Sequence, residues 1–276
     1  MTLPALVTAH LFPPLHVKLI ELLRSLDDDE WQLQTVAPAW RVRDVAAHLL
    51  DTQQRLVSRL RGEPQPPPPP IHSNADLVAL LNRLNDEGVR RYRRLDPVEL
   101  IELMEDGADE CARHHQSLDP FAAAPFGVSW AGEEASANWF HTARELTERW
   151  HHQQQIRLAV GRPGIMTPEL YHPVLECFMR ALPFAYRDRT REAGSLARIN
   201  VSGDCGGSWF LQRDPDRWRL VASPSGRLLS EATIPQEIAW LIFTKGIRRH
   251  EAEPQVRVTG DADLGRHVLQ MIAIVG

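Results

Sequence analysis

The central stretch of the sequence reads Asn138-Trp-Phe-His-Thr-Ala-Arg-Glu-Leu-Thr-Glu-Arg-Trp-His-His-Gln-Gln-Gln-Ile-Arg157. It predicts the middle of a long helix, from about residue 134 to residue 160. Glu148 and His152 lie one helical turn apart, so both side chains can reach a single ion. Carboxylate and neutral imidazole are usual ligands of zinc and similar divalent metals, but two ligands do not close a site. The best candidate for a third is His48, 100 residues upstream of Glu148.

The same stretch has a second interpretation, in which its polar side chains only face water. It carries an apolar stripe and, roughly opposite, a polar stripe, as in an amphipathic surface helix. The apolar stripe is Trp139, Ala143, Leu146 and Trp150, and the polar stripe is His141, Glu145, Glu148 and His152. A helix with two tryptophans can also pack on both sides, so the spacing leaves both interpretations open.

The segments before this stretch are also predicted to be helical. Apolar spacing and start signals indicate helices at about 15–26, 41–60, from Ser73 onward, and 97–117. On the second of these, His48 lies at the margin of the apolar stripe, where a side chain can point into a cleft. Asp44 precedes it by one turn and is predicted to orient its imidazole as a hydrogen-bond acceptor.

The second half of the chain has a different pattern. The charged stretch 187–194 predicts a domain boundary between a helical bundle at residues 1–186 and a small α+β domain at residues 195–276. No strand is expected before this boundary. After it, strands are predicted at 197–201, 208–212, 218–221 and 255–259, with helices from Pro235 and over 261–274.

Composition limits the classes of protein to be considered. The chain has 276 residues and a formal net charge of −5, which argues against nucleic acid as a main partner. Its three cysteines are scattered and odd in number, as in a reducing compartment. No apolar run approaches the roughly 20 residues that cross a bilayer, and the N-terminus does not resemble a signal peptide. A cytoplasmic protein that needs no membrane is expected.

Two segments together resemble the mycothiol-dependent maleylpyruvate isomerase family. They are Trp40-Arg-Val-Arg-Asp-Val-Ala-Ala-His48-Leu and Ala143-Arg-Glu-Leu-Thr-Glu-Arg-Trp-His-His-Gln-Gln-Gln-Ile-Arg-Leu-Ala-Val-Gly161. The resemblance implies a DinB-like four-helix bundle followed by a sterol-carrier-like domain. It implies that His48, Glu148 and His152 hold a divalent metal, usually taken as zinc, whereas His151 matches no ligand and is the rival one position away. The family often has an aspartate where this chain has Gln155.

Three protein ligands of nitrogen and oxygen type leave a coordination position open, as in catalytic metal sites. An open divalent cation can bind and deprotonate a thiol. The resemblance implies that this thiol is mycothiol or a counterpart, a cosubstrate for isomerisation or S-transfer on a small electrophile such as maleylpyruvate. No protein cysteine is expected to take part. A metal-dependent hydrolase and a non-catalytic metal- or apolar-ligand-binding protein stay open as alternatives, and so does the oligomeric state.

Within the C-terminal domain, the resemblance implies that a basic residue can help to bind an acidic substrate. The loosely matching candidates are Lys245, Arg248 and Arg249. Their other interpretation is a solvated basic helix end.

Overall fold

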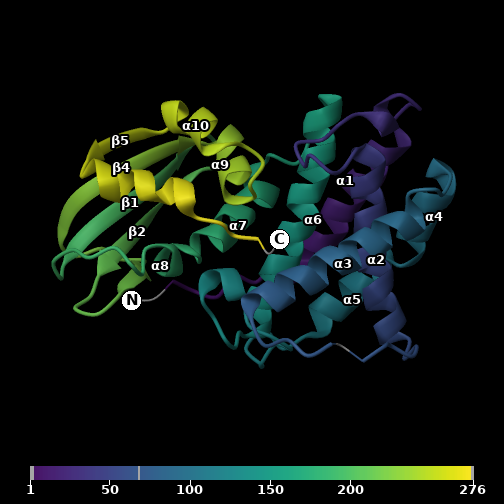
Figure 1. The fold of residues 1–276 in the computed structure, drawn as a ribbon, viewed down its shortest axis with the longest axis horizontal. Coiled ribbons are helices and arrows are strands. Elements are labelled where there is room, and N and C mark those ends of the chain that lie inside the picture. Colours follow the sequence, from purple (N-terminus) through teal and green to yellow (C-terminus); the bar gives the residue numbers. More distant parts are fainter. Residues whose placement is uncertain (1–2, 68, 275–276) are drawn as a thin grey trace. The chain divides into compact units, whose positions relative to one another are not determined.

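The computed structural model describes residues 3–67 and 69–274, and it contains two compact units. The helical unit is formed by Ala9–Leu118 and Glu148–Ile165, and the sheet unit by residues 3–8, Asp119–Thr147 and Met166–Ile274. The predicted architecture is therefore confirmed: a helical N-terminal region is followed by a small α+β domain built on a sheet (Figure 1). The outermost residues of the predicted domains, 1–2 and 275–276, lie outside the described residues.

The helical unit is made of long helices whose start signals lie in the sequence. Pro13 and Pro14 occupy the first turn of one helix, and the Ser73 side chain caps another by accepting a hydrogen bond from the Asp76 N–H at 3.1 Å. The helices are α1 (Phe12–Arg24), α2 (Val42–Leu60), α3 (Asn74–Tyr92), α4 (Pro97–Asp106), α5 (Ala108–Ser117) and α6 (Asn138–Val160), of which the part from Glu148 onward belongs to this unit.

The single helix predicted over 97–117 was wrong, because Gly107 separates α4 from α5. A Cβ atom at Gly107 would lie 2.7 Å from the Gln53 side-chain nitrogen on α2. The break therefore occurs where the backbone passes close to α2, a contact that local helical spacing does not reveal.

The core of the helical unit joins α1, α2, α4 and the end of α6. Its buried members include Leu23, Val42, Leu50, Met104 and Ile156. Burying a side chain of this size contributes about 1.5–3 kcal/mol. This core holds α2 and α6, the two helices that carry the predicted ligands, in fixed positions.

The sheet unit contains a five-stranded sheet in the order β3-β2-β1-β4-β5. Strands β1 and β4 run parallel, and the other neighbouring pairs are antiparallel. The strands are β1 (Ser195–Ser202), β2 (Gly207–Arg213), β3 (Trp218–Val221), β4 (Arg227–Pro235) and β5 (Arg257–Gly260). The helices of this unit, besides the start of α6, are α7 (Pro168–Met179), α8 (Leu182–Ala185), α9 (Gln236–Phe243), α10 (Arg249–Ala252) and α11 (Ala262–Arg266).

Strand β4 was missed by the sequence analysis. Its inward positions include Ser230 and Ala232, which are small and give a weak apolar signal. The buried Ser230 hydroxyl donates to the Asp261 carbonyl oxygen at 2.8 Å, so its polar group is satisfied inside the unit. Before residue 187 the described residues form only two isolated bridges and no strand, as predicted.

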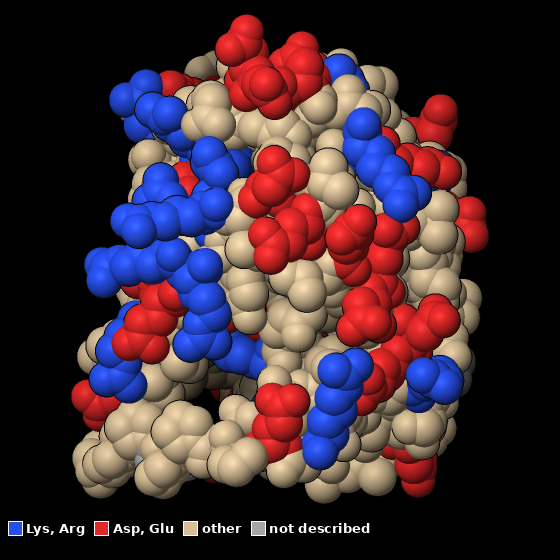
Figure 2. Space-filling view, turned by 90° about the vertical axis from the view of Figure 1, so that its right-hand side faces the viewer, with Lys and Arg blue, Asp and Glu red and all other residues tan. Residues whose placement is uncertain are grey.

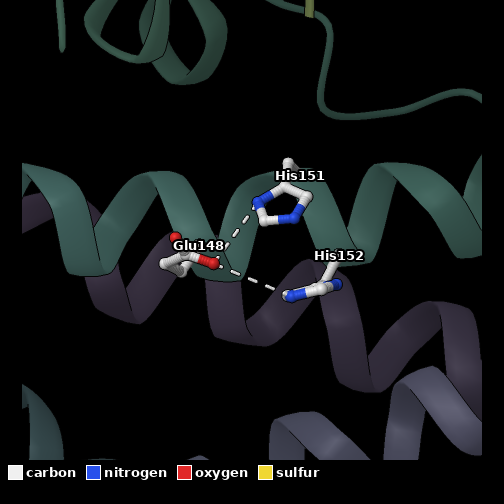
Figure 3. A group of neighbouring side chains, drawn as sticks. All are labelled: Glu148, His151 and His152. Carbon is white, nitrogen blue, oxygen red and sulfur yellow. Dashed lines mark ion pairs between the residues drawn. The ribbon is translucent and has the colours of Figure 1, made fainter. Parts of the chain in front are cut away.

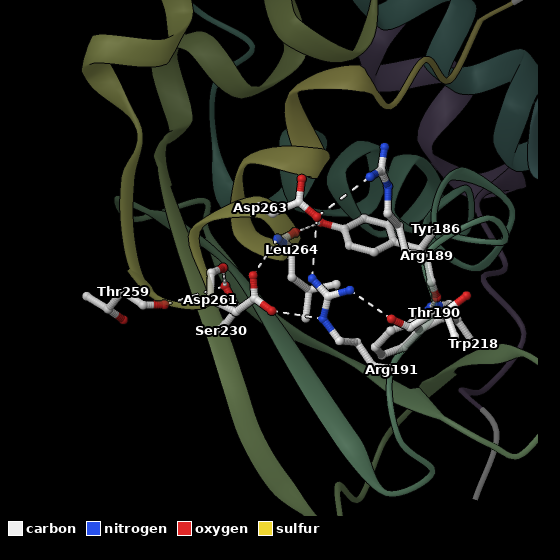
Figure 4. Close-up of polar contacts among 10 residues, drawn as sticks. All are labelled: Tyr186, Arg189, Thr190, Arg191, Trp218, Ser230, Thr259, Asp261, Asp263 and Leu264. Atoms are coloured by element: carbon white, nitrogen blue, oxygen red, sulfur yellow. Dashed lines mark hydrogen bonds and ion pairs between the residues drawn. The ribbon is translucent and has the colours of Figure 1, made fainter.

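The charged stretch 187–194 is anchored to the sheet unit (Figure 4). Arg191 Nε donates to Asp261 Oδ2 at 2.8 Å, and Arg189 lies 3.6 Å from the Asp263 carboxylate. The Arg189 carbonyl oxygen also accepts from Trp218 Nε1 at 2.7 Å. The compact units divide elsewhere, at Leu118, Thr147 and Ile165. That a cut within 187–194 yields two folded fragments stays a prediction.

The surface carries both signs of charge. On the face drawn in Figure 2, basic side chains gather along one edge and acidic side chains lie over the middle and the opposite side. Among the described residues, no helix is both long enough and apolar enough to span a membrane.

Candidate metal centre

Two of the three predicted ligands from different helices, His48 and His152, lie side by side, although they are far apart in the sequence. His48 projects from α2 and His152 from α6, and their ring centroids are 4.6 Å apart in an edge-to-face arrangement. On α6, Glu148 Oε2 lies 3.8 Å from His152 Nε2. Whether these three side chains hold an ion stays a prediction.

His151 joins the same cluster. Its Nδ1 lies 3.8 Å from Glu148 Oε2, and its ring centroid is 3.9 Å from that of His152. Figure 3 shows the Glu148 carboxylate directed toward both imidazoles. One donor atom from each of Glu148, His151 and His152 lies within 4.8 Å of the others. Among the described residues this is the one group of three that meets this distance, so the geometry places the rival His151, and not His48, beside both Glu148 and His152.

Burial keeps the imidazoles of His48 and His152 neutral. His48 is 6% exposed and His152 is 8% exposed. Burial lowers the pKa of His152 to about 3, with a further contribution from His151, while Glu148 opposes the shift. Burial also places the pKa of His48 well below its usual value. At neutral pH both rings keep a lone pair, which is the form that binds a metal.

Gln155 orients the His152 ring. His152 Nδ1 lies 2.9 Å from Gln155 Oε1. An amide oxygen only accepts, so Nδ1 carries the proton and the lone pair of His152 sits on Nε2, the atom nearest Glu148. The role of Gln155 was left open by the sequence, although its spacing of three residues from His152 on one helix was the available signal.

The prediction that Asp44 orients His48 was wrong. Asp44 Oδ2 accepts from the Arg41 N–H at 3.0 Å in a capping box, and Oδ1 pairs with Arg93 Nε at 3.1 Å. His48 Nδ1 is buried and has no hydrogen-bond partner among the described residues. Trp40 instead packs against the cluster, with ring centroids 4.8 Å from His48 and 5.7 Å from His152.

The interpretation of α6 as a solvated surface helix was wrong for its second half. Every residue from Trp150 to Arg157 is buried, so this part of the helix is covered around its whole circumference. Within the cluster, His151 and His152 are buried, whereas the Glu148 side chain is 28% exposed. The cluster therefore lies at the edge of the interior, with its carboxylate partly open to solvent.

The three basic candidates of the sheet unit lie at and just before α10. Arg248 precedes the short helix α10 and pairs with Glu251 in a capping box. Lys245 adopts a left-handed backbone conformation with φ of 61°. For Arg248, this pairing matches the expected solvated helix end.

Comparison with known proteins identifies the family. No curated protein sequence matches the chain. A crystal structure of a histidine-to-alanine variant of the mycothiol-dependent maleylpyruvate isomerase is similar in fold, with a TM-score of 0.55 and 11% identity over 94% of this chain and 95% of that chain. A second crystal structure of the mycothiol-dependent maleylpyruvate isomerase gives a TM-score of 0.51 and 11% identity over 88% and 90% of the respective chains. At this identity the likeness concerns the fold.

The sequence match is more specific. The family described as the mycothiol maleylpyruvate isomerase N-terminal domain matches residues 12–157, which are more than half of the chain and include His48, Glu148 and His152. This chain therefore belongs to the mycothiol maleylpyruvate isomerase family.

Proposed function

We propose that this protein is a metal- and thiol-dependent enzyme, which uses mycothiol or a related small thiol to isomerise or S-conjugate a small electrophile. The observation that carries the proposal is the approach of His48 on α2 to His152 on α6, where His152 also lies 3.8 Å from Glu148. The proposed ligands are His48 Nδ1 or Nε2, one Glu148 carboxylate oxygen and His152 Nε2. Membership of the family supports the thiol and the isomerase class.

The residues fit a divalent metal on two grounds. The donor set of two imidazoles and one carboxylate is one that zinc uses in catalytic sites, with a further position open. The buried His48 Nδ1 has no hydrogen-bond partner among the described residues, and a bound divalent metal would give its lone pair a partner. When bound, the metal supplies positive charge that favours the deprotonated form of a coordinating thiol.

The chain's own side chains prepare the site for this chemistry. Burial keeps His48 and His152 unprotonated, and Gln155 holds the His152 ring so that Nε2 faces Glu148. Trp40 covers both imidazoles with an apolar surface and excludes water from that side.

In the proposed reaction the external thiol supplies the nucleophile. Its thiolate adds to one carbon of an activated cis double bond and breaks the π bond. After rotation about the resulting single bond, expulsion of the thiolate restores the double bond as trans. Protonation of the adduct instead gives a stable thioether. The three cysteines of the chain are all buried, which suits a reaction in which no protein thiol reaches the substrate.

Elemental analysis of the purified protein and turnover assays with a small thiol test the proposal. We expect about one divalent metal per chain, and turnover of a maleylpyruvate-type electrophile only when the thiol is present. His152→Ala should lose both metal and turnover. Turnover without thiol would instead favour a hydrolase, and bound metal without turnover in either assay would favour a non-catalytic protein.

A further inference from the structure

A cavity in the helical unit lies between α1, α2, α5 and α6, and its lining includes the exposed residues Val17 and Asp109, so it is open to solvent. Its volume is about 100 Å³, several times the roughly 10–15 Å³ that one water molecule needs on this scale. Apolar side chains form most of its wall: Phe12, Leu15, Leu19, Leu49, Ala108 and Ala112. The cavity therefore has room for a small molecule with an apolar part.

One buried amide faces this cavity without a partner. Gln153 lines the cavity, is 1% exposed, and has both its side-chain oxygen and its nitrogen buried with no hydrogen-bond partner among the described residues. The other glutamine of the wall, Gln53, uses its nitrogen to donate to the Met104 carbonyl oxygen at 2.7 Å. A buried amide that makes no hydrogen bond costs about 1–3 kcal/mol. Gln153 thus offers one acceptor and one donor to whatever fills the cavity.

The cavity is also lined by one cation and one anion. The Arg149 guanidinium carbon lies 5.8 Å from the Phe12 ring centroid, and Arg149 Nε is buried without a hydrogen-bond partner among the described residues. Asp109 lies in the first turn of α5 and is exposed. The pKa of His16 is lowered to about 4, chiefly by burial and next by the positive charge of Arg149, whereas the negative charge of Asp109 opposes the shift. His16 therefore senses both charged groups of the cavity. His16 is therefore neutral at pH 7 and adds no charge.

These groups lie on a different face of α6 from the metal cluster. Arg149 comes directly after the cluster residue Glu148, and Gln153 comes directly after the cluster residue His152. One position rotates the side chain by about 100° around the helix. The cavity and the cluster thus share two helices but are separate sites.

We propose that this cavity binds a small zwitterion, an α-amino acid with a short aliphatic side chain. Its carboxylate would pair with Arg149, its ammonium group would donate to Gln153 Oε1 and face Asp109, and its side chain would contact Leu15 and Leu49. A ligand with one carboxylate and one ammonium group matches a wall that carries one cation, Arg149, and one anion, Asp109. An acid alone would leave the buried Gln153 oxygen without a donor, and an amine alone would leave the buried Arg149 Nε without an acceptor.

Isothermal titration of the full-length protein with L-valine tests this site. We expect saturable binding to the metal-loaded and the metal-free protein alike, because no cluster residue takes part. Isobutylamine and isobutyrate are matched probes that each lack one of the two charges, and each should bind at least tenfold more weakly than L-valine. This comparison needs no variant and therefore does not depend on folding of a mutant.

Matched variants locate the site. Arg149→Met and Gln153→Leu should each weaken L-valine binding at least tenfold, and Asp109→Asn should weaken it severalfold. Gln154→Leu is the control, because Gln154 is a neighbouring buried glutamine that does not line the cavity. Circular dichroism and the metal content show whether each variant keeps its fold.

Three results would overturn the proposal. The first is absence of saturable binding to the wild-type protein, as expected if the cavity holds only water. The second is equal affinity for L-valine and isobutyrate. The third is binding that folded Arg149→Met and Gln153→Leu proteins retain in full, or that disappears with the metal. None of these results bears on whether the metal cluster is catalytic, so the two proposals fail separately.

Discussion

Replacing Gln155 by leucine should weaken metal binding at His152 without removing a ligand. In the metal-free variant, His152 can move its proton to Nε2, which lies 3.8 Å from Glu148 Oε2. Metal binding requires the lone pair on Nε2 and returns the proton to Nδ1. In the wild type this N–H donates to Gln155 Oε1 at 2.9 Å, but in the variant it would be buried with no acceptor.

The size of the effect follows from that lost partner. Gln155 is 5% exposed, so water has little access to replace its oxygen. Leaving a buried N–H unsatisfied costs about 1–3 kcal/mol, which corresponds to a loss of about 10–100-fold in affinity, the range typical of groups that orient metal-bound histidines. Gln155→Glu restores an acceptor and should bind the metal at least as tightly as the wild type.

Competition between the metal-free protein and a chelator of known zinc affinity measures the effect. Gln154→Leu serves as the matched control, since the Gln154 side chain points about 100° away around α6. Zinc affinity of folded Gln155→Leu within twofold of both the wild type and this control would refute the reasoning. It would mean that the orientation of His152 does not limit binding, or that the ion lies elsewhere.

Four further predictions concern the cluster, the cysteines and stability. His48→Ala should lose the metal, whereas His151→Ala should retain it with an affinity within about tenfold; the reverse result in elemental analysis would make His151 the third ligand. Replacing each cysteine by serine should leave thiol-dependent turnover unchanged, and loss of turnover with the metal still bound would identify a protein nucleophile. The folded protein holds His16 neutral down to about pH 4, while the unfolded chain binds a proton below about 6.5. Stability should therefore fall as the pH drops across this range, and His16→Leu should reduce the fall by about 2 kcal/mol in denaturant titrations; an equal fall in both proteins would contradict this. Arg191→Met removes a contact with Asp261 and should make residues 187–194 cleave faster in limited proteolysis, with a loss of about 1 kcal/mol in unfolding free energy; unchanged cleavage would show that the remaining contacts suffice.

Several features followed from the sequence because their causes are local. The helical start signals at Pro13 and Ser73 act within one turn, and the structure shows helices beginning there. The spacing of Glu148 and His152 brings their side chains together on one turn of any helix. The change from helical to alternating periodicity near residue 195 likewise marks the start of β1.

Other features depended on contacts between segments far apart in the chain. Only the packing of α2 against the end of α6 brings His48 to the cluster, and only that packing leaves its Nδ1 buried without a partner. Asp44 was assigned to the wrong partner because Arg93, which competes for its carboxylate, comes from a distant segment. The sequence also did not predict the break at Gly107 or the buried face of β4, because both depend on contacts with distant segments.

The sequence by itself thus determined the helical character of the first part, the sheet of the second and the pair Glu148 and His152, since periodicity, capping and one-turn spacing act over a few residues. The tertiary structure brought His48 beside His152 and decided which groups stay buried without a hydrogen-bond partner among the described residues. These properties depend on close packing between distant segments, where a shift of a few ångströms changes the partner of a polar atom.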